Sequence, residues 1–301
     1  MNILTTTSTF CAGGFDERLR VIHNPYGRRL TEGEITSLVK EYNPVGIVAG
    51  VEPLTRKVME SSENLRIISR VGTGLDSVDL IAAGELGISV LNTPDAPTEA
   101  VAELTLGMIL SVLRKIPLLD RNVRNSIWKG PNGLLLKGKT VGIIGCGRIG
   151  SRLAELLKPF DCVLIGFDPA VQNHELIEMV SLDALIETSD IVTLHIPLNS
   201  NTKDILSAER IKSFKKGAVL VNVSRGNLVD ESALLESLEK GHLFGAALDC
   251  FADEPYNGPL LELDNVILSP HMGSSTSETR EKMERNAVEN LMAELKRLRL
   301  I

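Results

Sequence analysis

The sequence has few cysteines, no excess of basic residues and no long run of apolar ones. Its four cysteines (Cys11, Cys146, Cys162 and Cys250) are far apart and form no C-x-x-C pair. Neither a disulfide framework nor a zinc site is therefore expected, and no metal is predicted. Lys and Arg number 32 against 39 Asp and Glu, which gives a net charge of −7. This acidic balance argues against nucleic acid as the main partner, because a phosphate-binding surface needs a basic excess.

The sequence also offers no segment that would cross or enter a membrane. The most apolar stretch, Leu104–Leu113, has about half the length that a bilayer-spanning helix needs. The first residues, MNILTTTSTF, lack the basic and apolar regions of a signal peptide. We therefore expect a cytoplasmic protein without a membrane partner. With 301 residues, of which 43% are hydrophobic and 24% charged, the chain is long enough for two folded domains.

Short β-branched runs alternate with helical patterns along the chain, which is typical of α/β proteins. Several of the runs are apolar on both faces, as the buried strands of a parallel sheet are. The predicted strands are Asn2–Thr6, Gly46–Ala49, Leu65–Ser69, Ser89–Asn92, Thr140–Ile144, Cys162–Phe167, Ile191–His195, Ala218–Asn222, Gly245–Leu248 and Asn265–Leu268. Helical patterns between them include Arg148–Lys158, Ser181–Glu187, Ser207–Ser213 and Glu231–Lys240.

These elements form two groups, so we predict two parallel-sheet domains of the Rossmann or flavodoxin type with a cleft between them. Between the groups, Glu99–Arg114 is apolar nearly all round, so it is expected to be buried on all sides or partly by a second subunit. The last helical segment, Ser277–Leu300, carries one apolar stripe and is expected to return to the first group. The predicted domains are therefore residues 1–95 together with 276–301, and residues 96–275.

The segment Thr140–Gly150 (TVGIIGCGRIG) carries the pattern G-x-G-x-x-G between a predicted strand and a predicted helix. Gly145 would allow the tight turn, Gly147 the approach of the backbone to a pyrophosphate, and Gly150 the close packing of helix on strand. The next strand ends at Asp168, whose carboxylate would accept hydrogen bonds from ribose hydroxyls and repel a 2′-phosphate. The alternative is a glycine-rich turn in an unrelated α/β domain. The context favours a dinucleotide site in the second domain, with NAD rather than NADP as the cofactor.

Five more residues are expected near this cofactor. Arg148 and Ile149 begin the helix whose N-terminus would bind the phosphates. His195 ends a predicted strand and, with Pro197, is expected to line the cofactor site. Asp249 ends a later strand and could contact the nicotinamide or its ribose.

Three polar residues late in the chain follow three successive predicted strands, where ligands bind in folds of this kind. Arg225 could hold a carboxylate through two parallel hydrogen bonds and polarise a neighbouring carbonyl. Glu254 could pair with a histidine, and His271 suits proton transfer near neutral pH. Each also has an ordinary alternative: a surface arginine that caps a turn, a solvated loop acid, and a histidine that caps a strand end.

Taken together, the three residues suggest carbonyl reduction by hydride transfer from NADH. His271 would give the substrate oxygen a proton, and Glu254 would fix the tautomer of His271. Arg225 would bind the carboxylate and carbonyl of a 2-oxo acid. In the reverse direction His271 would act as the base.

These motifs resemble the D-isomer-specific 2-hydroxyacid dehydrogenase family, and within it the short 3-phosphoglycerate dehydrogenases. The resemblance extends over nearly the whole chain, and no single segment carries it alone. The matching segments are Ser69–Leu80, Asn92–Gly107, Gly138–Gly150, His195–Leu206, Asn222–Glu231, Ala247–Pro255 and Ser269–Thr276.

The resemblance implies that Arg225, Glu254 and His271 are the catalytic residues. It also implies that residues 1–95 with 276–301 bind the substrate, through Arg70 and through backbone amides around Val71, Gly72 and Gly74. Enzymes of the family are usually homodimers, so a homodimer is expected here. A phosphorylated substrate would need basic residues as well, and Arg28, Arg29 and Arg70 are candidates for that role. The alternative for Arg28 and Arg29 is a solvated surface pair.

Several functions stay open within and beyond this resemblance. The first is NAD-dependent oxidation of 3-phosphoglycerate, a step of serine biosynthesis, and the second is hydroxypyruvate or glyoxylate reduction. A third is a non-catalytic NAD-sensing scaffold, which the three intact catalytic positions argue against. Formate dehydrogenase fits poorly, because those relatives have Gln where this chain has Glu254.

Overall fold

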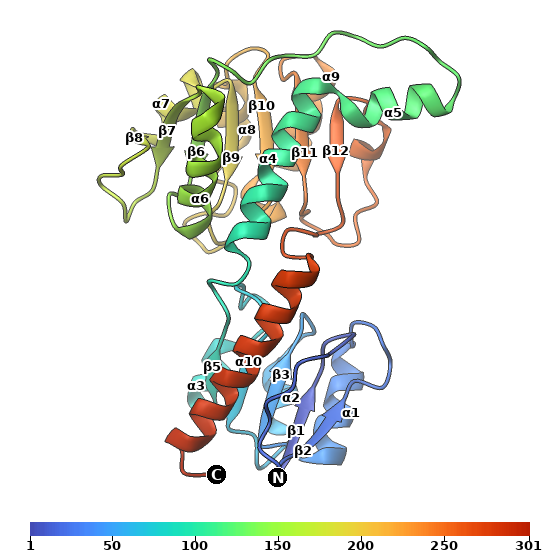
Figure 1. The fold of residues 1–301 in the computed structure, drawn as a ribbon, viewed down its shortest axis with the longest axis vertical. Helices are drawn as coiled ribbons and strands as arrows, with labels where there is room; N and C mark the ends of the chain where they lie inside the picture. Colours follow the sequence, from blue (N-terminus) through green and yellow to red (C-terminus); the bar gives the residue numbers. More distant parts are fainter. The chain divides into compact units, whose positions relative to one another are not determined.

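The computed structural model, which describes residues 1–301, contains two parallel β-sheets in two separate units (Figure 1). Unit 1 comprises Met1–Pro97 and Ser274–Ile301, and unit 2 comprises Thr98–Gly273. These junctions lie two residues from the predicted ones. The prediction of an α/β fold with two parallel sheets is confirmed.

Unit 1 is built on five parallel strands in the order β2-β1-β3-β4-β5. Alternate strand residues point to opposite faces. Leu4 and Ile47 pack with α1, α2 and α3, whereas Ile3 and Val48 pack with α10. The strands are β1 (Asn2–Thr5), β2 (Arg20–His23), β3 (Gly46–Ala49), β4 (Ile67–Arg70) and β5 (Ser89–Leu91), and the helices are α1 (Glu32–Tyr42), α2 (Arg56–Glu60), α3 (Leu80–Glu85) and α10 (Ser277–Arg297).

The C-terminal helix α10 completes unit 1, as its apolar stripe predicts. Met283, Ala287, Leu291 and Leu295 are buried against the sheet. The Ser69 hydroxyl of β4 donates a hydrogen bond of 2.7 Å to the carbonyl of Ala287. The sheet is therefore covered on both faces, which explains why its central strands β1, β3 and β4 are largely buried.

Unit 2 is built on seven parallel strands in the order β12-β11-β10-β9-β6-β7-β8. The strands are β6 (Thr140–Ile144), β7 (Val163–Phe167), β8 (Glu178–Met179), β9 (Ile191–Leu194), β10 (Val219–Asn222), β11 (Gly245–Leu248) and β12 (Val266–Leu268). The helices are α4 (Thr98–Arg114), α5 (Ile116–Arg124), α6 (Arg148–Leu157), α7 (Leu182–Thr188), α8 (Ala208–Lys212) and α9 (Glu231–Glu239), with short 3₁₀ turns at Lys158–Phe160, Gly226–Leu228 and Pro259–Glu262.

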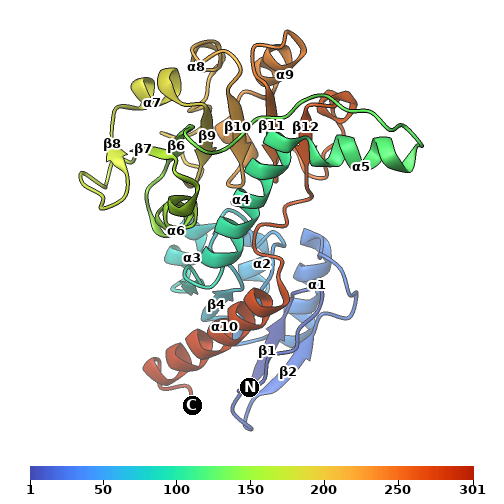
Figure 2. The same ribbon diagram turned by 45° about the horizontal axis from the view of Figure 1, so that its top comes forward.

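Helices cover both faces of the unit 2 sheet. Val219 and Val221 pack with α4 and α6 on one face, and Leu220 packs with α7, α8 and α9 on the other (Figure 2). The chain runs outward from β6 to β8 and then returns to β9 on the other side of β6. Ligands of doubly wound sheets bind at such a reversal, beyond the carboxyl ends of the strands.

The predicted strands lie within two residues of the observed ones, but β2 and β8 were not predicted. Both are edge strands. β2 (RVIH) is partly exposed along its length, and β8 has only two residues. Neither therefore carries the continuous apolar run that marks a central parallel strand. None of the helices combines the length and the apolar character that a membrane-spanning helix requires.

Candidate active site

The glycine turn between β6 and α6 has the geometry of a dinucleotide-binding loop. Gly145 adopts φ +98°, and a Cβ there would lie 2.5 Å from the carbonyl oxygen of His195. A Cβ on Gly150 would lie 2.0 Å from the carbonyl oxygen of Gly145. A Cβ on Gly147, the N-cap of α6, would meet no protein atom within 4 Å. The first and third glycines are thus required by packing, whereas the space beside the second is open for a bound pyrophosphate.

Asp168, directly after β7, faces this turn. One carboxylate oxygen accepts a hydrogen bond of 2.9 Å from the amide of Cys146, and the other accepts one of 2.8 Å from the amide of Ala170. These bonds fix the carboxylate beside the glycine loop. This is where the sequence predicts that ribose hydroxyls bind. The glycine loop and the Asp168 carboxylate together therefore fit a dinucleotide.

The other predicted cofactor residues also lie near the carboxyl ends of the unit 2 strands. Arg148 and Ile149 begin α6, and Pro197 lies three residues beyond the end of β9, where its carbonyl accepts a hydrogen bond from Thr202. The ring of His195 contacts the Thr193 hydroxyl at 3.0 Å, and its buried Nδ1 has no hydrogen-bond partner in the protein. Burial lowers the pKa of His195 to about 3, so this ring is neutral at physiological pH.

Arg225 is positioned by a turn at the carboxyl end of β10. The side-chain oxygen of Asn222 accepts from the Ser224 amide at 3.0 Å, and its nitrogen donates to the Arg225 carbonyl at 2.8 Å. The Ser224 hydroxyl donates to the carbonyl of Leu194 on β9. Asn222 therefore closes a short turn that holds Arg225 at the rim of the sheet, partly exposed.

The loop after β11 is packed tightly against this turn. A Cβ on Gly226 would lie 1.8 Å from the backbone carbon of Phe251, so only glycine fits next to Arg225. The Phe251 amide donates to a Glu254 carboxylate oxygen at 3.1 Å. These contacts place Glu254 beside the Arg225 turn.

Glu231 at the start of α9 also anchors the loop. Its carboxylate accepts a hydrogen bond of 2.7 Å from the Ala252 amide. No motif in the sequence indicates this role of Glu231.

His271, in the loop after β12, faces Glu254. Its Nδ1 lies 3.0 Å from one carboxylate oxygen of Glu254 and 3.1 Å from the other. Both side chains are partly exposed. The backbone of His271 adopts φ +56°, a left-handed conformation that is strained for a residue with a Cβ.

Asp249 holds the His271 loop in place. The side chain is fully buried and accepts hydrogen bonds from the Ser269 hydroxyl and from the amides of Met272 and Gly273, the last two at 2.7 Å. Both carboxylate oxygens are therefore engaged by residues on either side of His271. The sequence predicts a cofactor contact for Asp249, and that contact remains a prediction, whereas its bracing of the loop was not anticipated.

Arg225, Glu254 and His271 thus follow three adjacent strands, β10, β11 and β12, at one edge of the sheet. The buried thiol of Cys250, directly after β11, lies 3.7 Å from the carbonyl oxygen of Asn222. Burial and the charge of Asp249 raise the pKa of this thiol. A base or acid held by a carboxylate, next to a guanidinium, is suited to moving a proton on a carboxylate-bearing substrate. No cluster of three or more His, Cys, Asp or Glu side chains is arranged to hold a metal ion.

The predicted substrate residues of unit 1 lie at the carboxyl end of β4. Arg70 ends that strand. The amide of Val71 donates to the Ala49 carbonyl, and the amide of Gly72 donates to the Thr93 hydroxyl, both at 2.8 Å. These two amides are thus engaged inside the unit. The amide of Gly74 makes no backbone–backbone hydrogen bond, so of these amides it is the better placed for a substrate carboxylate.

Comparison with known proteins agrees with this geometry. A family model described as "D-isomer specific 2-hydroxyacid dehydrogenase, NAD binding domain" matches residues 106–273. The solved structure of the TT0316 protein from Thermus thermophilus superposes with a TM-score of 0.90 at 37% identity, covering 98% of this chain and 97% of that one.

Two curated relatives carry different names. The D-3-phosphoglycerate dehydrogenase of Methanocaldococcus jannaschii is 41% identical over 260 residues, which cover 84% of this chain and 49% of that protein. The chain therefore spans about half the length of that relative. The hydroxypyruvate reductase of Thermotoga maritima is 38% identical over 273 residues, which cover 88% of this chain and 89% of that protein.

The fold and the matched cofactor unit define the class of protein, an NAD-dependent oxidoreductase that acts on CH–OH donors. The chain belongs to the D-isomer specific 2-hydroxyacid dehydrogenase family. The predictions of this family and of NAD as cofactor are confirmed.

Proposed function

We propose that this chain interconverts a short 2-oxo acid and its D-2-hydroxy acid, with hydroxypyruvate or glyoxylate as the first candidate substrate. The contact of His271 with Glu254 at 3.0 Å, beside the Arg225 turn, carries the proposal. Bound NADH would supply the hydride, and side chains of unit 2 would supply the proton and orient the carbonyl.

The role of each side chain follows from its contacts. The Glu254 carboxylate accepts a hydrogen bond from Nδ1–H of His271, so that Nε2–H of the protonated ring is left to give its proton to the carbonyl oxygen of the substrate. Arg225 binds the carboxylate through paired hydrogen bonds and orients the carbonyl. In the direction of oxidation, the neutral His271 removes the proton of the hydroxyl group. Gly145, Gly147, Gly150 and Asp168 hold the cofactor.

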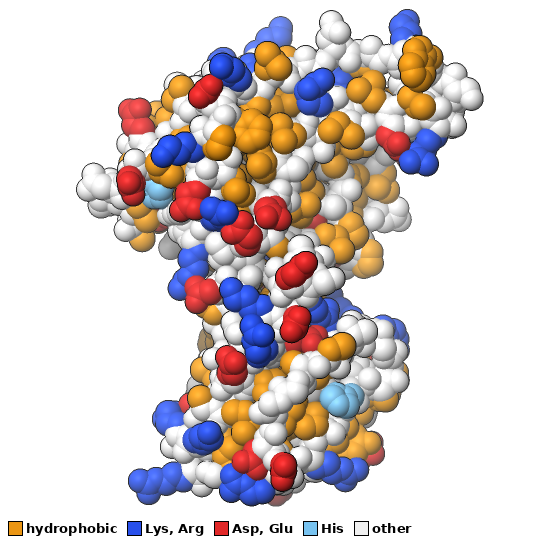
Figure 3. All heavy atoms as spheres, viewed as in Figure 1, with side chains coloured by type: hydrophobic (Ala, Val, Ile, Leu, Met, Phe, Trp, Pro, Cys, Tyr) orange, Lys and Arg blue, Asp and Glu red, His pale blue; other side chains and the backbone are white.

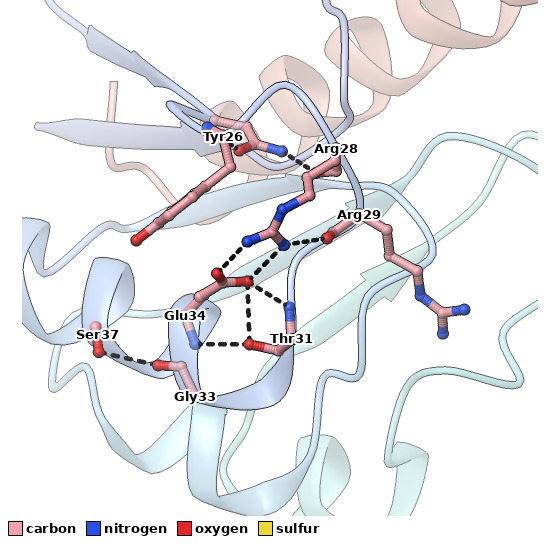
Figure 4. Close-up of polar contacts among 8 residues, drawn as sticks. Tyr26, Arg28, Arg29, Thr31, Gly33, Glu34 and Ser37 are labelled. Carbon is pink, nitrogen blue, oxygen red and sulfur yellow. Dashed lines mark hydrogen bonds and ion pairs between the residues drawn. The ribbon is translucent and has the colours of Figure 1, made fainter.

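The surroundings of Arg28 support an unphosphorylated substrate. Its guanidinium forms two hydrogen bonds to Glu34, at 2.6 and 3.0 Å, and lies 5.2 Å from the ring centre of Tyr26 (Figure 4). The Arg28 guanidinium and the Thr31 amide hold the pKa of Glu34 at about 2, so Glu34 stays ionised. Its negative charge therefore compensates the positive charge of Arg28, which leaves Arg28 less suited to binding a phosphate. Arg29 extends away from this cluster (Figure 4).

The second candidate is 3-phosphoglycerate, whose oxidation would place the chain in serine biosynthesis. It is supported by the likeness to the Methanocaldococcus jannaschii enzyme and by the exposed Arg29.

NADH oxidation with a panel of acids separates the two candidates. We expect hydroxypyruvate or glyoxylate to exceed 3-phosphohydroxypyruvate in kcat/KM by about tenfold or more, which is about 1.4 kcal/mol of transition-state discrimination. Pyruvate completes the panel as a test of the preferred substrate side chain, and NADPH as a test of the preferred cofactor. A higher kcat/KM for the phosphorylated acid would favour the second candidate. NADH binding without any turnover would favour a non-catalytic NAD-sensing scaffold.

We also propose that the chain forms a homodimer through α5 and the loop that follows it. No residue of α5 is buried, and Figure 1 shows this segment as an arm that extends from unit 2. Hydrophobic side chains are exposed on this arm (Figure 3). They include Val123, Trp128 and Leu135, which are 56%, 91% and 72% exposed. Such an exposed apolar surface marks an interface with another protein surface.

Light scattering after size exclusion tests the dimer. We expect a mass near twice 32.7 kDa, and a monomer for the double variant W128E/L135E. The variant V163E, which changes an apolar residue of unit 2 that is 52% exposed outside the arm, should remain dimeric. A monomeric wild-type protein at about 50 μM, well above the Kd of a stable homodimer, would exclude this interface.

A further inference from the structure

His174 links the segment after β7 to the glycine turn of the cofactor site. It lies between β7 and β8 and is partly buried. Its Nδ1 accepts a hydrogen bond of 3.1 Å from the Leu176 amide. Its Nε2 lies 2.9 Å from the hydroxyl oxygen of Ser151, in the first turn of α6. The imidazole is therefore held at both of its ring nitrogens.

These contacts fix the tautomer of the ring. The amide of Leu176 can only donate, so Nδ1 must be the nitrogen without a proton. Nε2 then carries the ring proton and donates a hydrogen bond to Ser151. The Ser151 hydroxyl in turn donates a hydrogen bond of 3.0 Å to the carbonyl of Cys146. A directional chain of hydrogen bonds therefore runs from His174 through Ser151 to Cys146 in the glycine turn.

The chain ends on a peptide group of the cofactor loop. The carbonyl of Cys146 and the amide of Gly147 belong to one planar trans peptide, so they point in opposite directions. The hydrogen bond from Ser151 to the carbonyl therefore sets the direction of the Gly147 N–H. That amide makes no backbone–backbone hydrogen bond, and the space beside Gly147 is open. A free amide at a helix N-terminus is a suitable donor to a phosphate oxygen.

The preceding peptide group of the turn has a separate anchor. The Cys146 amide donates its hydrogen bond of 2.9 Å to the Asp168 carboxylate. The contact with Asp168 therefore does not pass through His174. Asp168 holds the part of the turn where ribose hydroxyls are expected, and His174 holds the part next to the free Gly147 amide.

We propose that His174 is a positioning residue of the cofactor site, which acts through Ser151 to hold the Gly147 amide in the direction that binds the pyrophosphate of NAD. Both ring nitrogens are engaged within the protein, so the imidazole exerts its effect through Ser151. Because the amide is oriented before the cofactor arrives, binding loses less free energy to the ordering of the loop. The role concerns cofactor affinity and does not depend on which acid the chain reduces.

A double-mutant cycle with NADH titrations tests the inference. H174A removes both ring contacts, and S151A removes the hydroxyl that joins His174 to Cys146. We expect each variant to raise the Kd for NADH by about tenfold. The double variant H174A/S151A should raise it no further, because the two residues act in one chain of hydrogen bonds. H174Q, whose amide group offers an acceptor to Leu176 and a donor to Ser151, should keep the Kd within about threefold of wild type.

Displacement of NADH by smaller ligands locates the effect. ADP-ribose, which contains the pyrophosphate, should lose affinity for H174A as NADH does, whereas adenosine, which lacks it, should bind the variant and the wild-type protein alike. The matched control is H23A, because His23 of unit 1 contacts the Thr5 hydroxyl at 2.9 Å, and its Kd for NADH should be unchanged. If H174A does not fold, S151A applies the same test to the chain of hydrogen bonds.

Three results would overturn the inference. The first is an unchanged Kd for NADH in H174A or S151A. The second is a double variant whose effect is the product of the two single effects, since independent sites behave in this way. The third is an equal loss of affinity for adenosine and ADP-ribose, which would assign His174 to the adenosine part of the site or to general stability.

Discussion

Replacing His271 with alanine should abolish turnover while NADH binding is retained. In the structure the imidazole is held by Glu254 at 3.0 Å and is partly exposed, so it is available to a substrate and has no evident role in the core. A positioned general acid contributes about 10²- to 10⁴-fold to rate, and loss of this one also leaves Glu254 without its partner. We therefore expect kcat to fall by about 10³-fold or more. Steady-state rates and a fluorescence titration of NADH measure the two quantities separately.

Two further variants control this result. H271Q keeps a polar side chain of similar size that cannot act as an acid, and it should be as inactive as H271A. H242Q changes a histidine that precedes β11 and so lies at the amino ends of the strands, away from the candidate site. This variant should be fully active. A kcat for H271A within about tenfold of wild type would show that another group supplies the proton. Loss of NADH binding together with activity would assign His271 to the cofactor site.

The fold was largely predictable because its signals are local and repeated. Each central strand carries its own apolar run, and the glycine turn can be recognised from residues that are adjacent in the sequence. The structure adds the reasons. Gly145 and Gly150 are confined by backbone oxygens at 2.5 and 2.0 Å, whereas nothing in the protein confines Gly147. The edge strands β2 and β8 were missed because β2 is partly exposed along its length and β8 has only two residues, so neither carries a continuous apolar run.

The candidate site was predictable only in part. Arg225, Glu254 and His271 could be identified because each follows a strand, and parallel strands bring their carboxyl ends to one edge of the sheet. The ion pair of Arg28 could also have been anticipated, since Thr31 and Glu34 have the spacing of a capping box and the acid lies within reach of the preceding arginines.

Residues that act through tertiary contacts could not be found in this way. Glu231 binds the amide of Ala252, 21 positions along the chain, and no spacing rule connects a helix N-terminus to such a loop. His174 depends in the same way on Ser151, which lies 23 positions earlier in the chain. Such residues resemble ordinary surface residues in the sequence, and only the fold shows that they are engaged.

Asp249 is the clearest case, and replacing it with asparagine should disable catalysis without removing the cofactor. One carboxylate oxygen accepts from the Ser269 hydroxyl and the Met272 amide, and the other accepts from the Gly273 amide. Asparagine offers a single acceptor oxygen and sets its NH₂ group against a backbone N–H. The group that loses its partner is buried, which costs about 1–3 kcal/mol. His271 lies between these anchors in a strained backbone conformation, so the loop should relax.

The expected result for D249N is a fall in kcat of about 10²-fold, because a displacement of about 1 Å in a catalytic group has that effect. The Kd for NADH should change by less than about threefold. The exposed acid Asp264, which pairs with Arg121 in the same unit, gives the matched control D264N, for which both quantities should stay at wild-type values. A rise of about tenfold in the Kd for NADH with kcat maintained would contradict this role. It would instead make Asp249 a direct cofactor contact, since a residue that only braces the His271 loop cannot weaken cofactor binding and leave proton transfer intact.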